Sequence, residues 1–280
     1  MRDGPAAESE VRADRMSVRR LRQTVALGPQ CNPRVLLQSF LEKHDEESLS
    51  LRKVLREAIC ASETVSPIYR LAYKRYETEI NRIAVTAKVY PRPGGRLLTG
   101  AGGASVLESS ILLHPVYGVP LIAGSSVKGV VARYMHEVWG RTEAKFQERG
   151  EYHLAVFGDK DGRGGMQFLD AWWVPPSAGV KPTPFLVMDV LTPHHPPYYR
   201  GDRDKNTRSL IPPSDFDDPT PLAFLSATGR FLFAIQPEGG IEPSSPAKKW
   251  AELCKACLKQ ALKVWGIGAK TRKGYGRMEE

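Results

Sequence analysis

The sequence has few cysteines and no long apolar run. Its cysteines, Cys31, Cys60, Cys254 and Cys257, are too few and too scattered for a disulfide framework, so we expect a reducing, cytoplasmic setting. No stretch approaches the roughly 18 uninterrupted apolar residues of a membrane span, and we expect no membrane partner. The N-terminal stretch MRDGPAAESEVRADRM lacks the apolar segment of a secretory signal.

Acidic residues are the minority of the charged ones. The 40 Lys and Arg outnumber the 31 Asp and Glu, which gives a net charge of +9 and a pI near 9.4. This balance favours polyanionic partners, and nucleic acid comes first among them. With 280 residues, 41% hydrophobic and 25% charged, the composition is that of a globular protein and excludes disordered, collagen-like and coiled-coil classes.

Three regions are expected along the chain. Residues 1–33 are Arg-rich and poorly patterned, and we interpret them as a basic, flexible arm. Residues 34–90 form a helical region that packs on, or is inserted into, the core. Its apolar stripe at i, i+3, i+4, i+7 and i+8 starts at Leu51, and Pro67 opens a second helix that runs to about Arg82.

Residues 91–280 are expected to form one α+β domain. Periodicity predicts helices over 125–139 and 247–265, and strands near the start of the domain and over 166–174, 185–191, 228–235 and 275–278. A proline-rich segment, 192–222, interrupts this order as a long insertion. The resulting order is compatible with a β-α-β-β-α-β ferredoxin-like (RRM-like) core.

The last predicted helix carries one apolar face that includes a Cys-x-x-Cys pair. No second pair supplies two further zinc ligands, so Cys254 and Cys257 are expected to be buried as small apolar residues. The predicted buried face consists of Trp250, Leu253, Cys254, Cys257, Ala261 and Val264.

The most distinctive segment is a glycine-rich basic stretch, GIGAKTRKGYGR, at residues 266–277. It holds four glycines beside four cations, and a glycine lets the backbone approach a ligand closely. Clustered cations complement phosphate, and an aromatic ring can stack on a base. The alternative is a solvated basic turn. The candidate RNA-binding residues here are Lys270, Thr271, Arg272, Lys273, Tyr275 and Arg277.

A second candidate lies at the start of the helix predicted from residue 125. A helix N-terminus offers free N–H donors and partial positive charge to an anion. It is not a Walker A loop, because the required Gly-Lys-Ser/Thr run is missing. The alternative is an ordinary serine cap with a solvated lysine. The candidate RNA-binding residues here are Gly124, Ser125, Ser126, Lys128 and Arg133.

The third candidate is the loop 192–200, with sequence TPHHPPYYR. His194 and His195 could stack on bases, could pack on a neighbouring subunit, or could belong to a metal or acid–base site. The last option needs a third ligand, and none has convincing spacing. We therefore expect no bound metal and no cofactor, and we keep both histidines as candidate RNA-binding residues.

Four blocks in order resemble a known family. The segments LIAGSSVKGVVARYM, FGDKDGRGGMQFLDAWWVP, VMDVLTPHHPPYYRG and GIGAKTRKGYGRM are similar to the RAMP superfamily of CRISPR-associated RNA-binding proteins. Within it they resemble the branch of the sixth RAMP subunit of the type III-B Cmr antiviral effector. The resemblance spans about residues 96–277.

The resemblance implies a non-catalytic subunit that holds CRISPR guide RNA near its 3′ end. The implied partners are guide RNA, target RNA and neighbouring Cmr RAMP subunits. The rival hypothesis is a metal-independent CRISPR endoribonuclease, because some RAMP proteins process CRISPR RNA by general acid–base chemistry. Its candidate residues would be His194, Tyr198 and Ser125, but the sequence has no motif-level acid–base pair.

Overall fold

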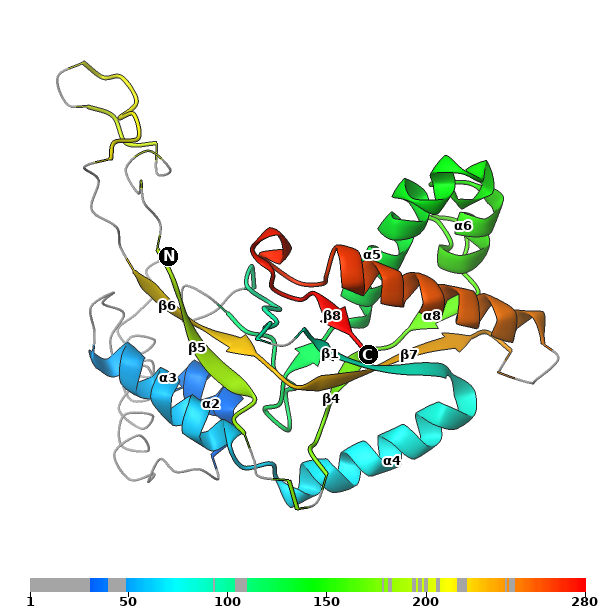
Figure 1. Cartoon of the computed structure of the whole chain (residues 1–280), viewed down its shortest axis with the longest axis horizontal. Helices are drawn as coiled ribbons and strands as arrows, with labels where there is room; N and C mark the ends of the chain where they lie inside the picture. Colours follow the sequence, from blue (N-terminus) through cyan, green and yellow to red (C-terminus); the bar gives the residue numbers. More distant parts are fainter. Residues whose placement is uncertain are drawn as a thin grey trace, which may run out of the picture.

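Two antiparallel sheets organise the chain (Figure 1). The computed structural model describes residues 31–39, 49–92, 94–103, 110–177, 179–180, 183–192, 195, 198, 201–204, 207–215, 221–239, 241 and 245–280. Residues 1–30, which make up nearly all of the expected basic arm, and His194 lie outside the described residues. No helix of the described part is long and apolar enough to cross a membrane.

The larger sheet has six strands in the order β2-β4-β7-β1-β8, with β3 also paired to β7. The smaller sheet is the antiparallel pair β5 and β6. The strands of the larger sheet are β1 (Val85–Pro91), β2 (Leu121–Ile122), β3 (Met166–Phe168), β4 (Ala171–Val174), β7 (Arg230–Pro237) and β8 (Met278–Glu279), and those of the smaller sheet are β5 (Leu186–Leu191) and β6 (Leu222–Ala227).

The centre of the larger sheet is the β1–β7 pair. Their antiparallel register runs from Val85 opposite Ile235 to Val89 opposite Phe231. Every residue of β7 from Phe231 to Ile235 is buried, as expected for a strand covered on both faces. In β1 the burial alternates along the strand, since Val85, Ala87 and Val89 are buried while the residues between them are partly buried or exposed.

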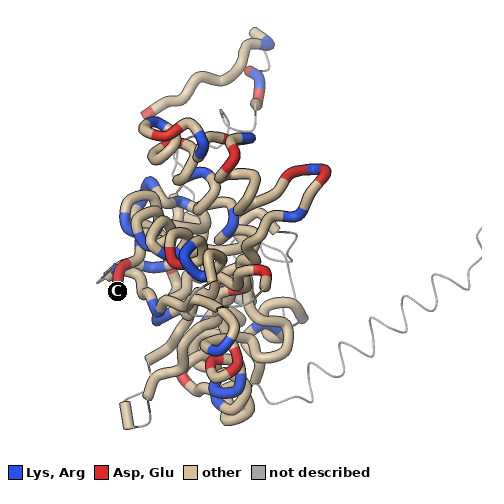
Figure 2. Tube along the Cα trace, turned by 90° about the vertical axis from the view of Figure 1, so that its right-hand side faces the viewer, with Lys and Arg blue, Asp and Glu red and all other residues tan. Residues whose placement is uncertain are grey.

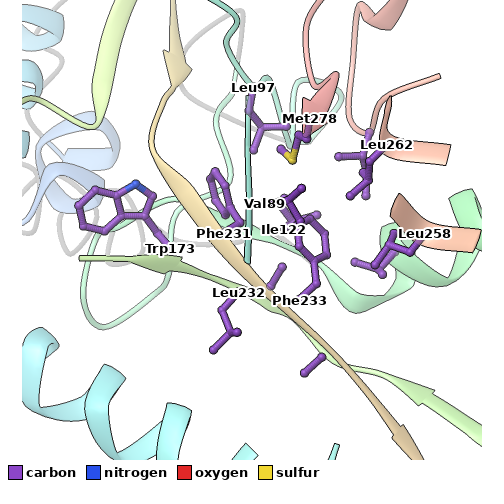
Figure 3. Close-up of a cluster of buried hydrophobic side chains, with 14 of the residues drawn as sticks. Val89, Leu97, Ile122, Trp173, Phe231, Leu232, Phe233, Leu258, Leu262 and Met278 are labelled. Carbon is purple, nitrogen blue, oxygen red and sulfur yellow. The ribbon is translucent and has the colours of Figure 1, made fainter. Parts of the chain in front are cut away.

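One face of this sheet is covered by α5 (Gly124–Glu137) and α8 (Pro246–Val264), as Figure 1 shows. Leu258 and Leu262 of α8 point toward Val89 and Phe233 of the sheet (Figure 3). The α8 helix begins at Pro246, one residue before the predicted start, and the Ser245 hydroxyl accepts the Ala247 N–H at 3.2 Å.

The opposite face is covered by α4 (Pro67–Ile83). Its tyrosines recur every three or four residues, which places them on the side that meets the sheet. The Tyr69 hydroxyl donates a hydrogen bond to the Trp173 carbonyl, and the Tyr76 ring stacks on Trp172 with centroids 4.4 Å apart. The larger sheet therefore lies between two helical layers.

The smaller sheet packs against α3 (Leu49–Ser62), which in turn packs on α2 (Pro33–Ser39). The Ser62 hydroxyl accepts the Leu186 N–H at 3.2 Å and so fixes the start of β5. The insertion between β5 and β6 extends beyond the outer ends of these strands, and its described residues 201–204 and 207–215 lie well away from the core (Figure 1). The remaining short elements are η1 (Trp139–Arg141), η2 (Ala144–Phe146), α6 (Glu151–Phe157) and η3 (Thr271–Lys273).

The helices expected from apolar periodicity are confirmed, and several strand expectations are wrong. The strand expected over 166–174 is two strands, because the chain leaves the ladder at Leu169 and Asp170. β1 lies upstream of the expected domain start at residue 91, and β6 was not expected at all. Val264 is half-exposed, since α8 passes the edge of the core at its last turn.

The Cys-x-x-Cys pair of α8 is buried, as expected. Both side chains are inaccessible to solvent, and the Cys257 thiol lies 3.7 Å from the Val131 carbonyl oxygen of α5. Burial raises the pKa of Cys254 to about 12, which keeps its thiol neutral. Cys254 and Cys257 thus belong to the α5–α8 contact.

This contact generates the first prediction. Val131→Asp should unfold the protein, because an unpaired buried carboxylate costs several kcal/mol, out of a typical stability of about 5–15 kcal/mol. The half-exposed Val264→Asp should shift the melting midpoint far less. Thermal unfolding followed by circular dichroism checks both. A Val131→Asp protein that melts cooperatively at the wild-type midpoint would contradict this packing.

Candidate nucleic-acid interface

The glycine-rich loop of residues 266–277 is tied down at both of its ends. The Ala269 N–H donates to the Leu98 carbonyl and the Gly276 N–H to the Arg96 carbonyl, both at 2.7 Å. The Ile267 N–H closes the base of the loop by donating to the Gly276 carbonyl at 2.9 Å. The central turn η3 then projects the side chains of Lys270, Arg272 and Lys273, all exposed, into solvent.

The glycines of this loop serve the chain's own packing. A Cβ at Gly276 would lie 1.8 Å from the Ile267 carbonyl oxygen, and one at Gly268 would lie 2.4 Å from that of Leu98. A Cβ at Gly266 would approach the Gly276 carbonyl to 2.8 Å. Three of the four glycines are therefore explained by backbone contacts within the fold. The sequence interpretation, in contrast, explains these glycines by a close approach of the backbone to a ligand.

The first backbone N–H of α5 already has a carboxylate partner within the protein. The Gly124 N–H donates to the Asp170 carboxylate at 2.7 Å, and a Cβ at Gly124 would lie 2.2 Å from the Phe168 carbonyl oxygen. The Lys128 ammonium donates to the Phe157 carbonyl at 2.7 Å, which directs it toward α6. Ser125 is exposed at this end of the helix. The first N–H and the lysine expected to hold phosphate thus have internal partners.

A groove of about 940 Å³ joins the two segments further along α5. One wall is α5, the second is the C-terminal loop with the end of α8, and the third is the Gly100–Gly103 turn. Five of the residues predicted from the sequence line it. These are Ser126, Arg133, Thr271, Arg272 and Arg277.

The cations of the groove differ in how far they are already neutralised. Arg133 pairs with Glu137 at 2.6 Å, and its guanidinium lies 5.7 Å from the centre of the Trp265 ring. Arg272 is exposed, and the Nε of Arg277 is buried without a hydrogen-bond partner. Among the described residues, no carboxylate forms an ion pair with Arg272 or Arg277. These two are the cations most available to a phosphate.

Charge alone does not mark this groove. Basic and acidic residues are interspersed along the described trace, as Figure 2 shows from one side. The groove is distinguished by its concave shape and by the guanidinium groups of Arg272 and Arg277, which lie beside glycine-rich backbone. It also holds residues that the sequence interpretation missed, namely Gly100, Ala101, Gly102, Gly103, Gly129, Val264 and Trp265. The run GAGG at 100–103 was the visible signal for the third wall.

Tyr275 is held on another side of the loop. Its hydroxyl donates to the Asp189 carboxylate at 3.1 Å, and the same carboxylate accepts the Ser226 hydroxyl at 2.6 Å and pairs with Arg96. Burial, together with Asp189, raises the pKa of Tyr275. Tyr275 therefore connects the loop to the smaller sheet and is not among the residues that line the groove.

The remaining predicted residues lie outside the groove. Lys270, just before η3, and Lys273, within it, are exposed, and neither lines the groove. His195 is half-buried in the segment that follows β5. No group of three or more His, Cys, Asp or Glu residues suited to a metal ion occurs in the described part of the chain.

The loop geometry generates the second prediction. Gly276→Ala should destabilise the protein by about 1–3 kcal/mol, because its Cβ collides with a backbone carbonyl and its φ of +67° disfavours alanine. Gly102→Ala, whose Cβ would meet nothing within 4 Å, should change stability by less than about 0.5 kcal/mol. Urea unfolding checks both variants. Equal stabilities would show that the loop is not packed as described.

Comparison with known proteins places this geometry in a family. The family model of the RAMP superfamily matches residues 95–279. The CRISPR system Cmr subunit Cmr6 of Pyrococcus furiosus is 29% identical over 264 residues, which cover 76% of this chain and 73% of that protein. The CRISPR system CMR subunit Cmr6 of Saccharolobus solfataricus is 30% identical over 94 residues, 33% of this chain and 28% of that protein.

Solved structures show the same fold. A chain of the type III-B Cmr-beta complex, solved by cryo-EM bound to cognate target RNA, superposes with a TM-score of 0.58 at 20% identity. The match covers 81% of this chain and 70% of that one. The family match spans well over half of the sequence and includes every wall of the groove. The chain belongs to the RAMP superfamily.

Proposed function

We propose that this chain is a non-catalytic RNA-binding subunit of a type III-B Cmr interference complex. It binds RNA in the groove between α5 and the glycine-rich loop. The observation that carries the proposal is that this groove brings together residues that the sequence singled out in two segments more than 130 positions apart, Ser126 and Arg133 in one and Arg272 and Arg277 in the other.

The groove suits single-stranded RNA chemically. The guanidinium groups of Arg272 and Arg277, which line the groove and form no ion pair with a carboxylate of the described residues, offer donors to phosphate oxygens. Trp265 and Val264 supply an apolar surface at the end of α8 on which a base can rest. Phosphate contacts of this kind hold RNA largely irrespective of sequence, as a guide-holding subunit requires.

The arrangement of the core supports a ferredoxin-like architecture. In chain order the central elements are β1, α5, β4, β7, α8 and β8, and the strands lie side by side as β4-β7-β1-β8. This is the β-α-β-β-α-β order with both helices on one face. We propose that β2, β3 and the smaller sheet are additions to that core.

The proposed partners, which are other Cmr subunits and RNA, are inferred from the similarity to the Cmr6 relatives. The relatives named Cmr6 favour a place beside other RAMP subunits in a cytoplasmic Cmr complex with guide RNA and target RNA. Contact near the 3′ end of the guide is part of the proposal. It is tested by mapping crosslinks between this chain and the RNA of a reconstituted complex.

The third prediction concerns the cations of the glycine-rich loop, namely Arg272, which lines the groove, and Lys270 and Lys273, which lie on the same loop outside it. Replacing Lys270, Arg272 and Lys273 by Ala should weaken binding and make the slope of log K against log salt shallower by up to roughly 2, at about 0.7 per phosphate. The loss should be similar for two unrelated RNAs. Fluorescence anisotropy of labelled single-stranded RNA at several salt concentrations measures it.

The matched control removes three cations from α4, on the other face of the sheet, by replacing Lys74, Arg75 and Arg82 with Ala. An equal change of slope in the two triple variants would contradict the groove, because only net charge would then matter. The same samples, incubated with and without Mg²⁺ and run on a denaturing gel, test catalysis. Cleavage lost on replacing Tyr198 or Ser125 would favour the endoribonuclease.

Gly129 gives the fourth prediction. It lies in the interior of α5, lines the groove, and its Cβ would meet nothing within 4 Å. Gly129→Ala should therefore stabilise the helix by about 0.5–1 kcal/mol. It should at the same time weaken RNA binding, because a side chain would keep the RNA backbone from the helix. Melting curves and anisotropy on the same protein separate the two effects, and unchanged affinity would place the RNA elsewhere in the groove.

A further inference from the structure

A second basic pocket lies apart from the groove, and the two cavities have no lining residue in common. It has a volume of about 490 Å³ and is formed where the ends of β1 and β7 meet β5. Arg92, Arg96 and Arg230 line it together with Tyr90 and Val187, and no acidic residue is among its lining residues. None of these residues was singled out from the sequence.

The three arginines differ in their availability. Arg92 donates to the Lys263 carbonyl at 2.8 Å, and its Nε lies 3.7 Å from the Glu279 carboxylate. Arg96 pairs with Asp189. Arg230 is exposed, its guanidinium lies 5.8 Å from the centre of the Tyr90 ring, and no carboxylate of the described residues forms an ion pair with it. Arg230 is therefore the cation that an incoming anion would meet first.

The pocket is built by backbone geometry. The Gly95 N–H donates to the Arg92 carbonyl at 2.6 Å and closes a turn. Arg92 begins this turn and Arg96 follows it. Across the pocket, the Trp173 indole N–H donates to the Thr228 carbonyl at 2.9 Å and fixes the connection from β6 to Arg230. The cations are thus held by elements of both sheets.

The pocket and the groove are linked by one backbone hydrogen bond. The Arg92 N–H donates to the Arg277 carbonyl at 3.1 Å, so a residue of the pocket and a residue of the groove are hydrogen-bonded neighbours. The Nε atoms of these same two arginines are the buried side-chain nitrogens without a hydrogen-bond partner in the described part of the chain. Unsatisfied guanidinium donors thus occur where the two cavities adjoin.

We propose that single-stranded RNA continues from the groove across residues 275–277 into this pocket, where Arg230 contacts a further phosphate. The proposal rests on the proposed function of the groove and extends the bound strand beyond it. Because phosphates are spaced regularly along a strand, a ligand that reaches both cavities must be longer than one that fills the groove alone.

RNA length and Arg230→Ala test this path. Anisotropy is measured with fluorescein-labelled RNAs from about 4 to about 16 nucleotides long. For the longer RNAs, Arg230→Ala should make the slope of log K against log salt shallower by about 0.7. If variant and wild type bind equally at 1 M salt, the variant should then bind about fivefold more weakly than the wild type at 0.1 M salt. The shortest RNA that binds should be unaffected. Arg230→Lys should restore most of the binding, and Arg75→Ala serves as an exposed control of equal charge.

The outcomes separate the pocket from the groove. If Arg230→Ala binds every length as the wild type does, while the loop triple variant is weakened, the pocket is overturned and the groove stands. Equal loss for short and long RNAs would overturn the path, because Arg230 would then belong to the primary site. If the wild-type chain binds no RNA of any length, the proposed function fails together with this extension.

Discussion

The backbone contacts between residues 96–98 and the glycine-rich loop hold the candidate interface together. Two hydrogen bonds of 2.7 Å and the close approach at Gly268 allow these segments to meet main chain against main chain. This contact fixes the position of the glycine-rich loop relative to residues 96–98, which lead directly into the Gly100–Gly103 turn. The loop follows the end of α8 at Val264 and carries Arg272 and Arg277 at the groove.

The protein supplies its own anions at two places where an RNA phosphate could otherwise have bound. Asp170 accepts a hydrogen bond from the first N–H of α5. Asp189 forms an ion pair with Arg96 and accepts hydrogen bonds from Ser226 and Tyr275. Carboxylates placed this way neutralise partial and full positive charges, and they fix the elements that carry them. Arg272 lines the groove and Arg230 lines the second pocket, and neither forms an ion pair with a carboxylate of the described residues.

The sequence was sufficient for the helices because their apolar stripes are long. The stripes of α5 and α8 recur over four or five turns, and a pattern of that length predicts its own buried face. It was insufficient for β1 and β6. Six- and seven-residue strands give little periodic pattern, and the alternation Val85, Ala87, Val89 was hidden by the helical region that precedes it.

The sequence located the two segments of the groove but not the partner of each side chain. Lys128 and Arg133 both lie on α5 and both carry positive charge, yet Lys128 is directed to the Phe157 carbonyl while Arg133 lines the groove. Five residues of α-helix separate them by about 500°, which places them on different faces. The sequence permits that calculation. It cannot say which face meets the loop, because this depends on how α5 packs on α8.

The apolar end of α8 shows how the same packing creates the apolar part of the candidate interface. The helix is amphipathic throughout, but its last turn extends past the edge of the core, so Val264 is half-exposed while Ala261 and Leu262 are fully buried. Trp265 then packs edge-on against Tyr134, with ring centroids 5.0 Å apart, and this contact holds its indole at the groove. A stripe that the sequence assigned wholly to the core thus ends as an anchored aromatic surface beside two available arginines. That combination of a fixed ring and unpaired guanidinium groups supports the proposed function, because a base can stack on an aromatic ring while its phosphates bind cations nearby.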